Sequence, residues 1–371
     1  MSEARGNRIS NELGSGGPTL SGITTFSGLN YFVPPKGTTA ERPSNCPSGS
    51  IRFNTDSAHL EYFDGLQWLE MESFNNELGV SGALGNRGIF HLGYNGTNRT
   101  NTLEYITITT LGNSQDFGDL TVIRSGTGAF SSSTRGVWAN GYDATPVNTN
   151  VIDYVTISST GNALDFGDTS YTTRDDGGLS NSTRGLFFGG QPSINNIEYV
   201  TIASTGNSVD FGDLTAIRSA ITGCSSSTRG LFVGGTPVTN IIDYATILTT
   251  GNAIDFGDLT AARGAIASCS NATRGIFGGG YNPTALNTID FVTIASIGNA
   301  QDFGDLSQTK SAFGSCSSPL RGVFGGGNTG PTGTNVIEYI TILTTGNAVD
   351  FGDSSTLYWT GGAVSNGHGG L

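Results

Sequence analysis

Between Arg87 and the C-terminus, one pattern of residues occurs six times. Each copy begins with Arg-Gly, continues with Glu or Asp, Tyr or Phe, any residue, Thr and Ile, and then has Asp-Phe-Gly-Asp. The copies start 48, 49, 45, 45 and 47 residues apart, at Arg87, Arg135, Arg184, Arg229, Arg274 and Arg321. Periods of about 20–50 residues are typical of propellers and solenoids, whose units bury their apolar faces against each other. The repeat therefore predicts one large array.

One copy, residues 228–270, has four strand-like segments separated by Gly, Asn and Asp turns. In residues 241–248, apolar and polar positions alternate with a period of two, which is the pattern of a strand. The other three segments are residues 230–235, 253–259 and 263–270. The last segment is rich in Ala, Gly and Ser, whose small side chains allow strands to pack closely around the central axis of a propeller. Four antiparallel strands in each of six copies predict an all-β, six-bladed β-propeller.

The spacing within the copies predicts one variable face. The repeated acid always lies 12 residues before Asp-Phe-Gly-Asp, whose first Asp lies 19 residues before the next repeat Arg. Only the segment between the Arg and the acid varies, from 14 to 18 residues. Equivalent loops of a propeller emerge on the same face, and rigid scaffolds often bind through such loops. We therefore expect the candidate binding loops to contain Tyr94, Tyr142 and Tyr281, although these loops could equally be tolerated insertions.

The ends of the array predict how its first sheet is completed. Two segments resemble an additional strand, Gly79–Gly85 before the first copy and Tyr358–Asn366 after the last. A ring of sheets has to cover its edge strands. The C-terminal segment has the register of the internal copies over its whole length, so we expect it to pair beside Arg87.

The repeated residues themselves indicate a scaffold. We expect the repeat arginines to form an internal ladder of ion pairs, because Arg suits a bidentate carboxylate partner. The Asp of Asp-Phe-Gly-Asp is expected to cap backbone amides in a turn, beside a buried phenylalanine. Those phenylalanines are Phe117, Phe166, Phe211, Phe256, Phe303 and Phe351. Asp-Phe-Gly is also a kinase signature, but six copies without the other kinase motifs exclude that role.

The order Arg-Gly-x-Phe-x-Gly-Gly, then Tyr, then a further aromatic residue resembles the kelch repeat over residues 79–371. Two departures stand out. Phe occupies the place in Asp-Phe-Gly-Asp where kelch repeats usually have Trp. The double glycine is replaced by Leu92-Gly93 in the first copy and by Asn140-Gly141 in the second. The resemblance implies a kelch-like propeller and does not bring with it the partners of eukaryotic kelch proteins.

Composition and charge narrow the function. The net charge of −13, with only two lysines among 371 residues, argues against nucleic-acid binding. No apolar run reaches the roughly 18 residues of a membrane helix, so no membrane insertion is expected. Cys224, Cys269 and Cys316 occupy one repeated position and are expected to be buried packing residues. Cys46 stands alone, so a disulfide framework is not expected.

Catalytic and metal-binding signals are few. The three histidines, His59, His91 and His368, are isolated in the sequence, and no pair of acids breaks the repeat pattern. Asp116 and Asp119 with their equivalents could supply only part of a calcium shell, which needs six to eight oxygens. We expect no catalytic residue, no cofactor and no metal site.

The first 86 residues form a different region. Residues 1–28 are polar and Gly/Ser-rich, which predicts an extended arm. Residues 29–72 contain strand-like segments at 50–54 and 59–63 and an Asp64-Gly65 turn, which predict a small β-module with Trp68 in its core. Residues 73–86 are expected to be a linker or an additional strand, followed by the propeller at 87–371.

Residues 42–68 carry the order Arg-Pro, Gly-x-Ile-Arg-Phe-Asn-Thr-Asp, and Leu-Glu-Tyr-Phe-Asp-Gly-x-x-Trp. This order resembles a short module of virion proteins, especially fibres, of tailed bacteriophages. The Gly-rich Asp-Phe-Gly-Asp repeats are similar to those of structural proteins of cyanobacterial phages. The resemblance implies a non-enzymatic virion protein, a fibre, knob or decoration subunit, assembled in the host cytoplasm. It implies attachment to other virion proteins through residues 1–72.

The sequence leaves partners and alternatives open. A host-surface glycan or receptor, or further copies of the chain, could contact the propeller. One alternative function is a virion enzyme that degrades or binds glycans, which a cluster of acids and aromatics breaking the repeat in one blade would favour. Another is a cytosolic kelch-like interaction scaffold, against which the virion-like first region argues.

Overall fold

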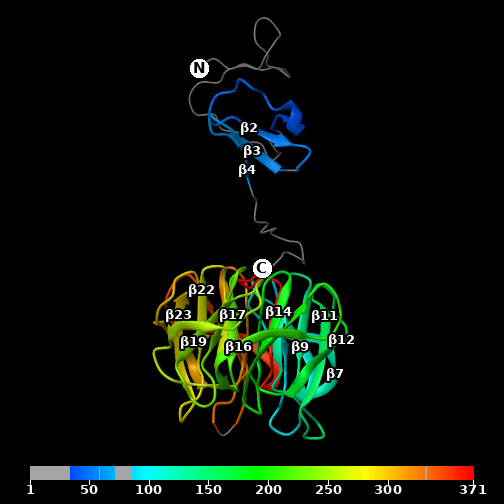
Figure 1. Cartoon of the computed structure of the whole chain (residues 1–371), viewed down its shortest axis with the longest axis vertical. Coiled ribbons are helices and arrows are strands. Elements are labelled where there is room, and N and C mark those ends of the chain that lie inside the picture. The colour runs from blue at the N-terminus through cyan, green and yellow to red at the C-terminus, as the bar shows by residue number, and fades with distance from the viewer. Residues whose placement is uncertain (1–33, 58, 72–85, 331) are drawn as a thin grey trace, which may run out of the picture. The chain divides into compact units, whose positions relative to one another are not determined.

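The computed structural model describes residues 34–57, 59–71, 86–330 and 332–371. The chain divides into two compact units, Met1–Asn76 and Glu77–Leu371. In the described ranges, every regular element is a β-strand except one 3₁₀ turn, Thr39–Glu41 (Figure 1). The predicted all-β class is confirmed. The predicted arm at 1–28, the boundaries at 28/29 and 72/73 and the segment Gly79–Gly85 lie outside the described residues.

The second unit consists of antiparallel sheets in a β-propeller-like arrangement, which we number in chain order of their repeat arginines. The first sheet contains β29 (Ala363–Ser365), β5 (Arg87–His91), β6 (Thr100–Thr107), β7 (Gln115–Ser125) and the short β10 (Tyr142–Asp143). The second contains β8 (Gly128–Ser131), β9 (Arg135–Ala139), β11 (Thr149–Thr156) and β12 (Leu164–Thr173). The third contains β13 (Gly177–Ser180), β14 (Arg184–Phe188), β15 (Ile194–Thr201) and β16 (Val209–Arg218).

The remaining three sheets repeat the same order. The fourth contains β17 (Thr222–Ser225), β18 (Arg229–Val233), β19 (Ile241–Thr246) and β20 (Ile254–Asp258). The fifth contains β21 (Ala267–Ser270), β22 (Arg274–Gly278), β23 (Leu286–Thr293) and β24 (Gln301–Lys310). The sixth contains β25 (Gly314–Ser317), β26 (Arg321–Gly325), β27 (Thr334–Thr341) and β28 (Val349–Tyr358).

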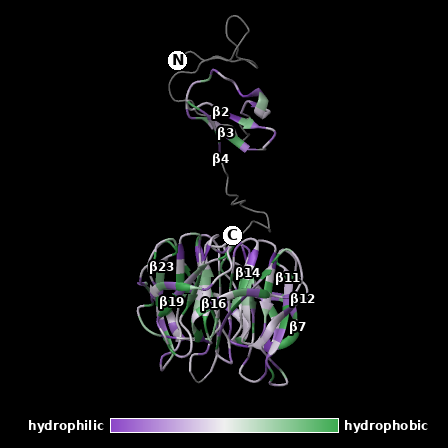
Figure 2. Ribbon diagram, in the orientation of Figure 1, coloured by the Kyte–Doolittle hydropathy of each residue, from purple (hydrophilic) through white to green (hydrophobic). Residues whose placement is uncertain are grey.

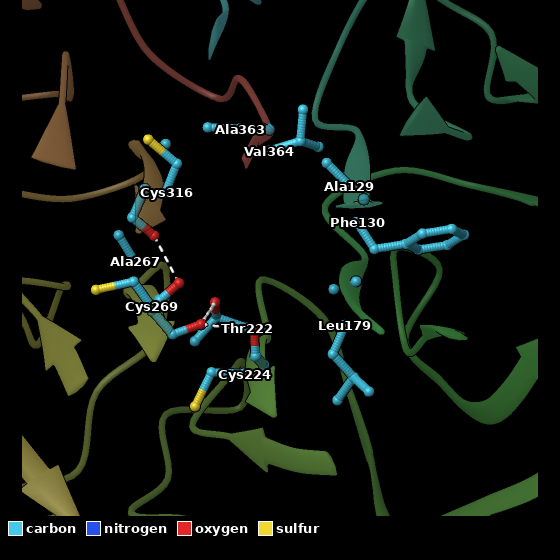
Figure 3. Close-up of a pocket in the computed structure, with 18 of the residues that line it drawn as sticks. Ala129, Phe130, Leu179, Thr222, Cys224, Ala267, Cys269, Cys316, Ala363 and Val364 are labelled. Carbon is cyan, nitrogen blue, oxygen red and sulfur yellow. Dashed lines mark hydrogen bonds between the residues drawn. The ribbon is translucent and has the colours of Figure 1, made fainter. Parts of the chain in front are cut away.

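The Ala-, Gly- and Ser-rich strands lie innermost. Each innermost strand contacts the next, in the order β8, β13, β17, β21, β25 and β29, and β29 contacts β8 again. Their residues surround a central cavity of about 160 Å³ (Figure 3). The C-terminal strand β29 pairs with β5, with Ala363 opposite Phe90. This is the pairing that the register of residues 358–366 predicts.

The hydrophobic core is divided among the spaces between neighbouring sheets, and strongly hydrophobic residues lie on the strands (Figure 2). Between the sixth and first sheets, for example, Phe351 and Tyr358 pack with Phe90 and Ile106. Each predicted repeat phenylalanine is at most 2% exposed. Cys224, Cys269 and Cys316 are 4–5% exposed, as their repeated position predicts. Burial raises the pKa of the Cys224 thiol to about 12, so this group is an inert packing residue.

The first unit is one four-stranded sheet with the order β1 (Lys36–Gly37), β2 (Ile51–Asn54), β3 (His59–Phe63) and β4 (Trp68–Met71). Strand β1 runs parallel to β2, and the other neighbours are antiparallel. The predicted segments at 50–54 and 59–63 therefore become β2 and β3, and the Asp64-Gly65 turn leads into β4.

The centre of this small sheet is polar, which corrects the prediction of a Trp68 core. Glu61 is fully buried and accepts hydrogen bonds from Arg42 at 2.6 Å and from Asn54 at 3.3 Å. The Arg52 guanidinium is 3.4 Å from the same carboxylate. Trp68 is only half-buried and packs its ring 5.5 Å from that of Phe63. A unit of this size has little apolar surface to bury, so a buried charge network organises it.

Candidate binding face

The six repeat arginines do not form the predicted ladder of ion pairs. Among the described residues, none of them lies within ion-pair distance of a carboxylate. Each donates Nη1 to a main-chain oxygen of a neighbouring sheet at 2.8–3.1 Å, and the acceptors are Ile157, Ile202, Ile247, Ile294, Ile342 and Ile108. Each guanidinium also lies 4.1–4.7 Å from the centre of an aromatic ring, in Tyr105, Tyr154, Tyr199, Tyr244, Phe291 and Tyr339. The ring and the carbonyl satisfy the cation without an acid.

Asp-Phe-Gly-Asp lies inside a strand in every copy, so the predicted amide-capping turn is wrong. The motif holds the Gly-Asn turn of the next sheet through its main chain. Gly161 donates its N–H to Phe117 O at 2.7 Å, and Asp119 donates its N–H to Asn162 Oδ1 at 3.1 Å. The same bonds link the last sheet to the first, where Gly112 donates to Phe351 O at 2.9 Å.

This contact explains why the spacing of 12 residues does not vary. Gly118 has a φ of +140°, and a Cβ atom there would lie 2.5 Å from Gly161 O. Only glycine tolerates both conditions. The segment from Asp153 to Asp165 contains the Gly-Asn turn, and this turn has to lie against Gly118 of the preceding sheet. A segment longer or shorter than 12 residues would move the turn away from Gly118.

The repeated acids form a second set of buried contacts between sheets. At four junctions a base from one sheet meets the acid of the next, in the pairs Arg124–Asp153, Arg218–Asp243, Arg263–Asp290 and Lys310–Glu338. At the other two, Thr173 and Tyr358 stand where the base would be. There the acids are Glu198 and Glu104, which accept hydrogen bonds from Ser208 and Ser114. The other four copies have Ala at this serine position. Hydroxyl donors thus replace the missing cation.

The inner strands are joined by a ring of serine hydroxyls. Each hydroxyl donates to the main-chain oxygen of the preceding serine at 2.6–2.8 Å, in Ser131, Ser180, Ser225, Ser270, Ser317 and Ser365. His368 lies against this ring, with Nε2 3.3 Å from Ser180 Oγ. Sequence reasoning missed this Ser–His contact because 188 residues separate the two.

The His368 contact is nevertheless structural. Its Nδ1 accepts a hydrogen bond from the Gly370 N–H, so the ring proton is on Nε2. That proton is donated to Ser131 O at 2.9 Å. In this tautomer, Nε2 cannot remove a proton from Ser180. The contact therefore does not form the nucleophile and base of a hydrolase.

One pair of acids does break the repeat, contrary to the sequence analysis. Asp175 and Asp176 replace residues that are Gly, Ala, Thr, Ile or Phe in other copies. The Asp176 carboxylate lines the central cavity and accepts hydrogen bonds from Asn140 Nδ2 at 2.8 Å and Gly128 N–H at 3.1 Å. Burial raises the pKa of Asp176 to about 7. Comparison of the residues eight and nine positions before each repeat Arg would have singled out this pair from the sequence alone.

The predicted loop tyrosines separate into two groups. Tyr94, between β5 and β6, and Tyr142, in β10 between β9 and β11, lie near each other, since Arg99 contacts both. Tyr94 forms a β-bridge with Arg99, and the Arg99 guanidinium is 4.3 Å from the centre of the Tyr142 ring. Tyr281 is 50% exposed and bridges Gly264 and Ala285 at the junction of the fourth and fifth sheets. The structure thus brings together two of the three candidates.

Two further residues complete this region and were missed from the sequence. Trp359 forms a β-bridge with Tyr94, and their rings meet edge to face at 5.0 Å. The Arg174 guanidinium is 4.2 Å from the centre of the Tyr142 ring. These five side chains form a continuous row, which we call the loop row: Trp359, Tyr94, Arg99, Tyr142 and Arg174.

The described residues contain no group of three or more His, Cys, Asp or Glu side chains that could hold a metal ion. Within the same ranges, no helix is long and apolar enough to cross a membrane. In comparisons with known proteins, no family model and no curated sequence matches the chain. The candidate site therefore rests on its geometry, which offers aromatic rings and guanidinium groups for binding.

Proposed function

We propose that this chain is a non-enzymatic structural protein of a tailed-bacteriophage particle. Residues 87–371 form a six-bladed, kelch-like β-propeller closed by its C-terminal strand, and residues 1–72 attach the chain to other virion proteins. The propeller presents its variable loops to a host surface or to a neighbouring subunit. The chain then acts as a fibre, knob or decoration subunit.

One observation supports a binding role more than any other. The repeated side chains are used in contacts between sheets: the arginines on carbonyls and rings, the phenylalanines in the core, and the acids on bases or hydroxyls. Residues that depart from the repeat are therefore the ones available for a partner. Several of them gather in the loop row, which carries no nucleophile. Rigid scaffolds that bind through variable loops follow this arrangement.

The virion assignment rests on the resemblance of residues 42–68 to phage attachment modules. Arg42, Arg52, Asn54 and Glu61 belong to the motif that carries this resemblance, and together they form the buried network of the first unit. The motif is therefore the folding signature of the unit. Loss of Glu61 would leave two arginines unpaired and unfold it.

The test is to localise the chain in purified particles of the virus that encodes it. Mass spectrometry should find the full-length chain in the particles, and cryo-electron microscopy should place residues 34–71 against another virion protein. Deletion of residues 1–72 and the substitution Glu61→Ala should each abolish incorporation while the circular dichroism of residues 87–371 is retained. Absence of the wild-type chain from particles, or full incorporation of both variants, would overturn the proposal.

A second candidate, hydrolysis of a surface glycan, has one observation in its favour. Asp175 and Asp176 break the repeat, and a carboxyl whose pKa is near 7 is suited to general acid catalysis. However, the cavity beside Asp176 measures about 160 Å³, below the roughly 300–1,000 Å³ of usual ligand pockets. Incubation of polysaccharides with the wild-type chain and with Asp176→Asn decides between the two: depolymerisation by the wild type alone would favour the enzyme.

A further inference from the structure

The basic residues of the second unit have an unequal distribution. Residues 87–371 contain twelve Lys or Arg residues. Six are the repeat arginines, and four pair with buried acids between sheets. The remaining two are Arg99 and Arg174. Both lie over the ring of Tyr142, although 75 residues of chain separate them.

The aromatic residues among the bridged pairs that follow the first strand of each copy are concentrated in the same place. In each copy, the residue after the Gly-Gly pair, or after its replacements Leu92-Gly93 and Asn140-Gly141, bridges a residue of the preceding sheet. Going around the sheets, these bridged pairs are Trp359–Tyr94, Ser125–Tyr142, Arg174–Gln191, Ser219–Thr236, Gly264–Tyr281 and Ser311–Asn328. The first three contain every large residue except Tyr281. The loop row is therefore a local departure from a ring of otherwise small and polar pairs.

The two guanidinium groups keep hydrogen-bonding capacity for a ligand. Arg174 forms a long ion pair with Asp175 through Nε at 3.5 Å and donates Nη1 to Asn148 Oδ1 at 3.4 Å. Among the described residues, its Nη2 has no hydrogen-bond partner. Among the described residues, Arg99 has no ion pair and no side-chain hydrogen bond; its Nε is buried, and its two Nη groups are the donors left for a ligand. The nearby Asp143 carboxylate is occupied by its own loop, where it accepts from the N–H groups of Thr145 and Val147.

We propose that the loop row binds an anionic saccharide, with sugar faces against Tyr94 and Trp359 and a carboxylate or sulfate group on Arg99 and Arg174. Guanidinium groups recognise such oxyanions through paired N–H donors. Part-exposed aromatic rings supply flat apolar faces, and the faces of sugar rings pack against them. An acidic peptide has no sugar ring to make this contact. The acidic remainder of the chain repels polyanions in general, so binding depends on this one row. This inference names the ligand class for the loop face and rests on the binding role proposed above.

The test uses the full-length chain and titration calorimetry with paired probes. Oligogalacturonate and its fully methyl-esterified form share a backbone and differ in charge, and dextran sulfate and dextran provide the sulfated pair. An oligoglutamate peptide tests acidic peptides. We expect binding of at least one charged saccharide, at least tenfold weaker binding of its neutral counterpart and of the peptide, and weaker binding at high salt.

The variants locate the site. Arg99→Gln and Arg174→Gln should each weaken the binding about tenfold, because each removes a charge-assisted contact from an exposed loop. Tyr281→Ala is the matched control: Tyr281 occupies the position equivalent to Tyr94 and Tyr142, but within the described ranges no guanidinium lies over its ring. It should bind like the wild type. Equal affinity for neutral saccharides, preference for the peptide, no binding of any probe, or unchanged binding by both arginine variants would overturn the inference. Since incorporation into particles is measured separately, such a result leaves the virion role to its own test.

Discussion

The contacts between sheets and the loop row use the same side chains in opposite ways. Between sheets, arginine over an aromatic ring occurs six times with nearly the same geometry and always with a main-chain oxygen as the second partner. In the loop row, two arginines share one ring, and neither guanidinium donates to a main-chain oxygen among the described residues. The first arrangement recurs in all six copies with the same partners, and the second occurs once.

The difference teaches where function can arise in a repeat protein. A side chain that contacts the neighbouring copy at every junction cannot change without disturbing the whole array, because each unit depends on the next. A side chain in a loop that differs in length from copy to copy has no such restriction. Residues that break the repeat are therefore better functional candidates than residues that define it. The following predictions test this contrast.

The largest effect is expected where a buried base is removed. Arg218→Thr leaves the Asp243 carboxylate, which is fully buried, without its cation and should lower the free energy of unfolding by about 3–5 kcal/mol. Urea denaturation measures this loss.

Another junction of the same chain shows how a buried acid can be stabilised without a base. At the junction where Thr173 replaces the base, Glu198 accepts a hydrogen bond from Ser208. The triple variant Arg218→Thr, Asp243→Glu and Ala253→Ser copies that arrangement and should recover most of the lost stability. If the triple variant is no more stable than Arg218→Thr alone, hydroxyl donors do not replace the cation.

An effect of similar size should accompany titration of Asp176. Its pKa is raised from 3.8 to about 7 in the folded chain, so between these values the folded state holds a proton that the unfolded state has lost. The contribution of this group to stability is therefore fully present below pH 4 and is lost as the pH rises to about 7. By linkage, the loss is on the order of 4 kcal/mol.

The difference between the wild type and Asp176→Asn reports on this group together with its coupling to the neighbouring Asp175 carboxylate, because every other titratable group is present in both. We expect the variant to gain stability relative to the wild type as the pH rises from 4 to 7, measured by thermal and urea unfolding. A difference that stays constant with pH would show that folding does not raise the pKa of Asp176, and that this break in the repeat has no effect on the pH dependence of stability.

Much of the fold could be predicted because it depends on periodicity. The alternation in residues 241–248 and the register of residues 358–366 both correspond to strands with the expected partners. The burial of Cys224 followed from the residues that replace it in other copies. Periodicity identifies which positions are equivalent and which are buried.

It does not identify which neighbouring group a side chain meets. From the sequence, Arg87 could donate to a carboxylate or to a main-chain carbonyl. It donates to the Ile157 carbonyl because the next sheet places that oxygen beside it. The loop row combines Tyr94 with Trp359, 265 positions later, and no local pattern marks that approach. The prediction that Trp68 forms the core of the first unit was wrong for a different reason. The centre of that small sheet is organised by the buried Glu61 carboxylate.

The smallest effect on stability is expected from the loops themselves. Tyr142→Ala removes a ring that lies under two guanidinium groups and should cost about 1 kcal/mol of unfolding free energy. Tyr281→Ala removes a half-exposed ring without such partners and should cost less than about 0.5 kcal/mol. Both values come from urea denaturation at one pH. A cost for Tyr281→Ala close to that of Arg218→Thr would mean that the variable loops stabilise the array as strongly as the repeated contacts, and the separation between scaffold and binding residues would fail.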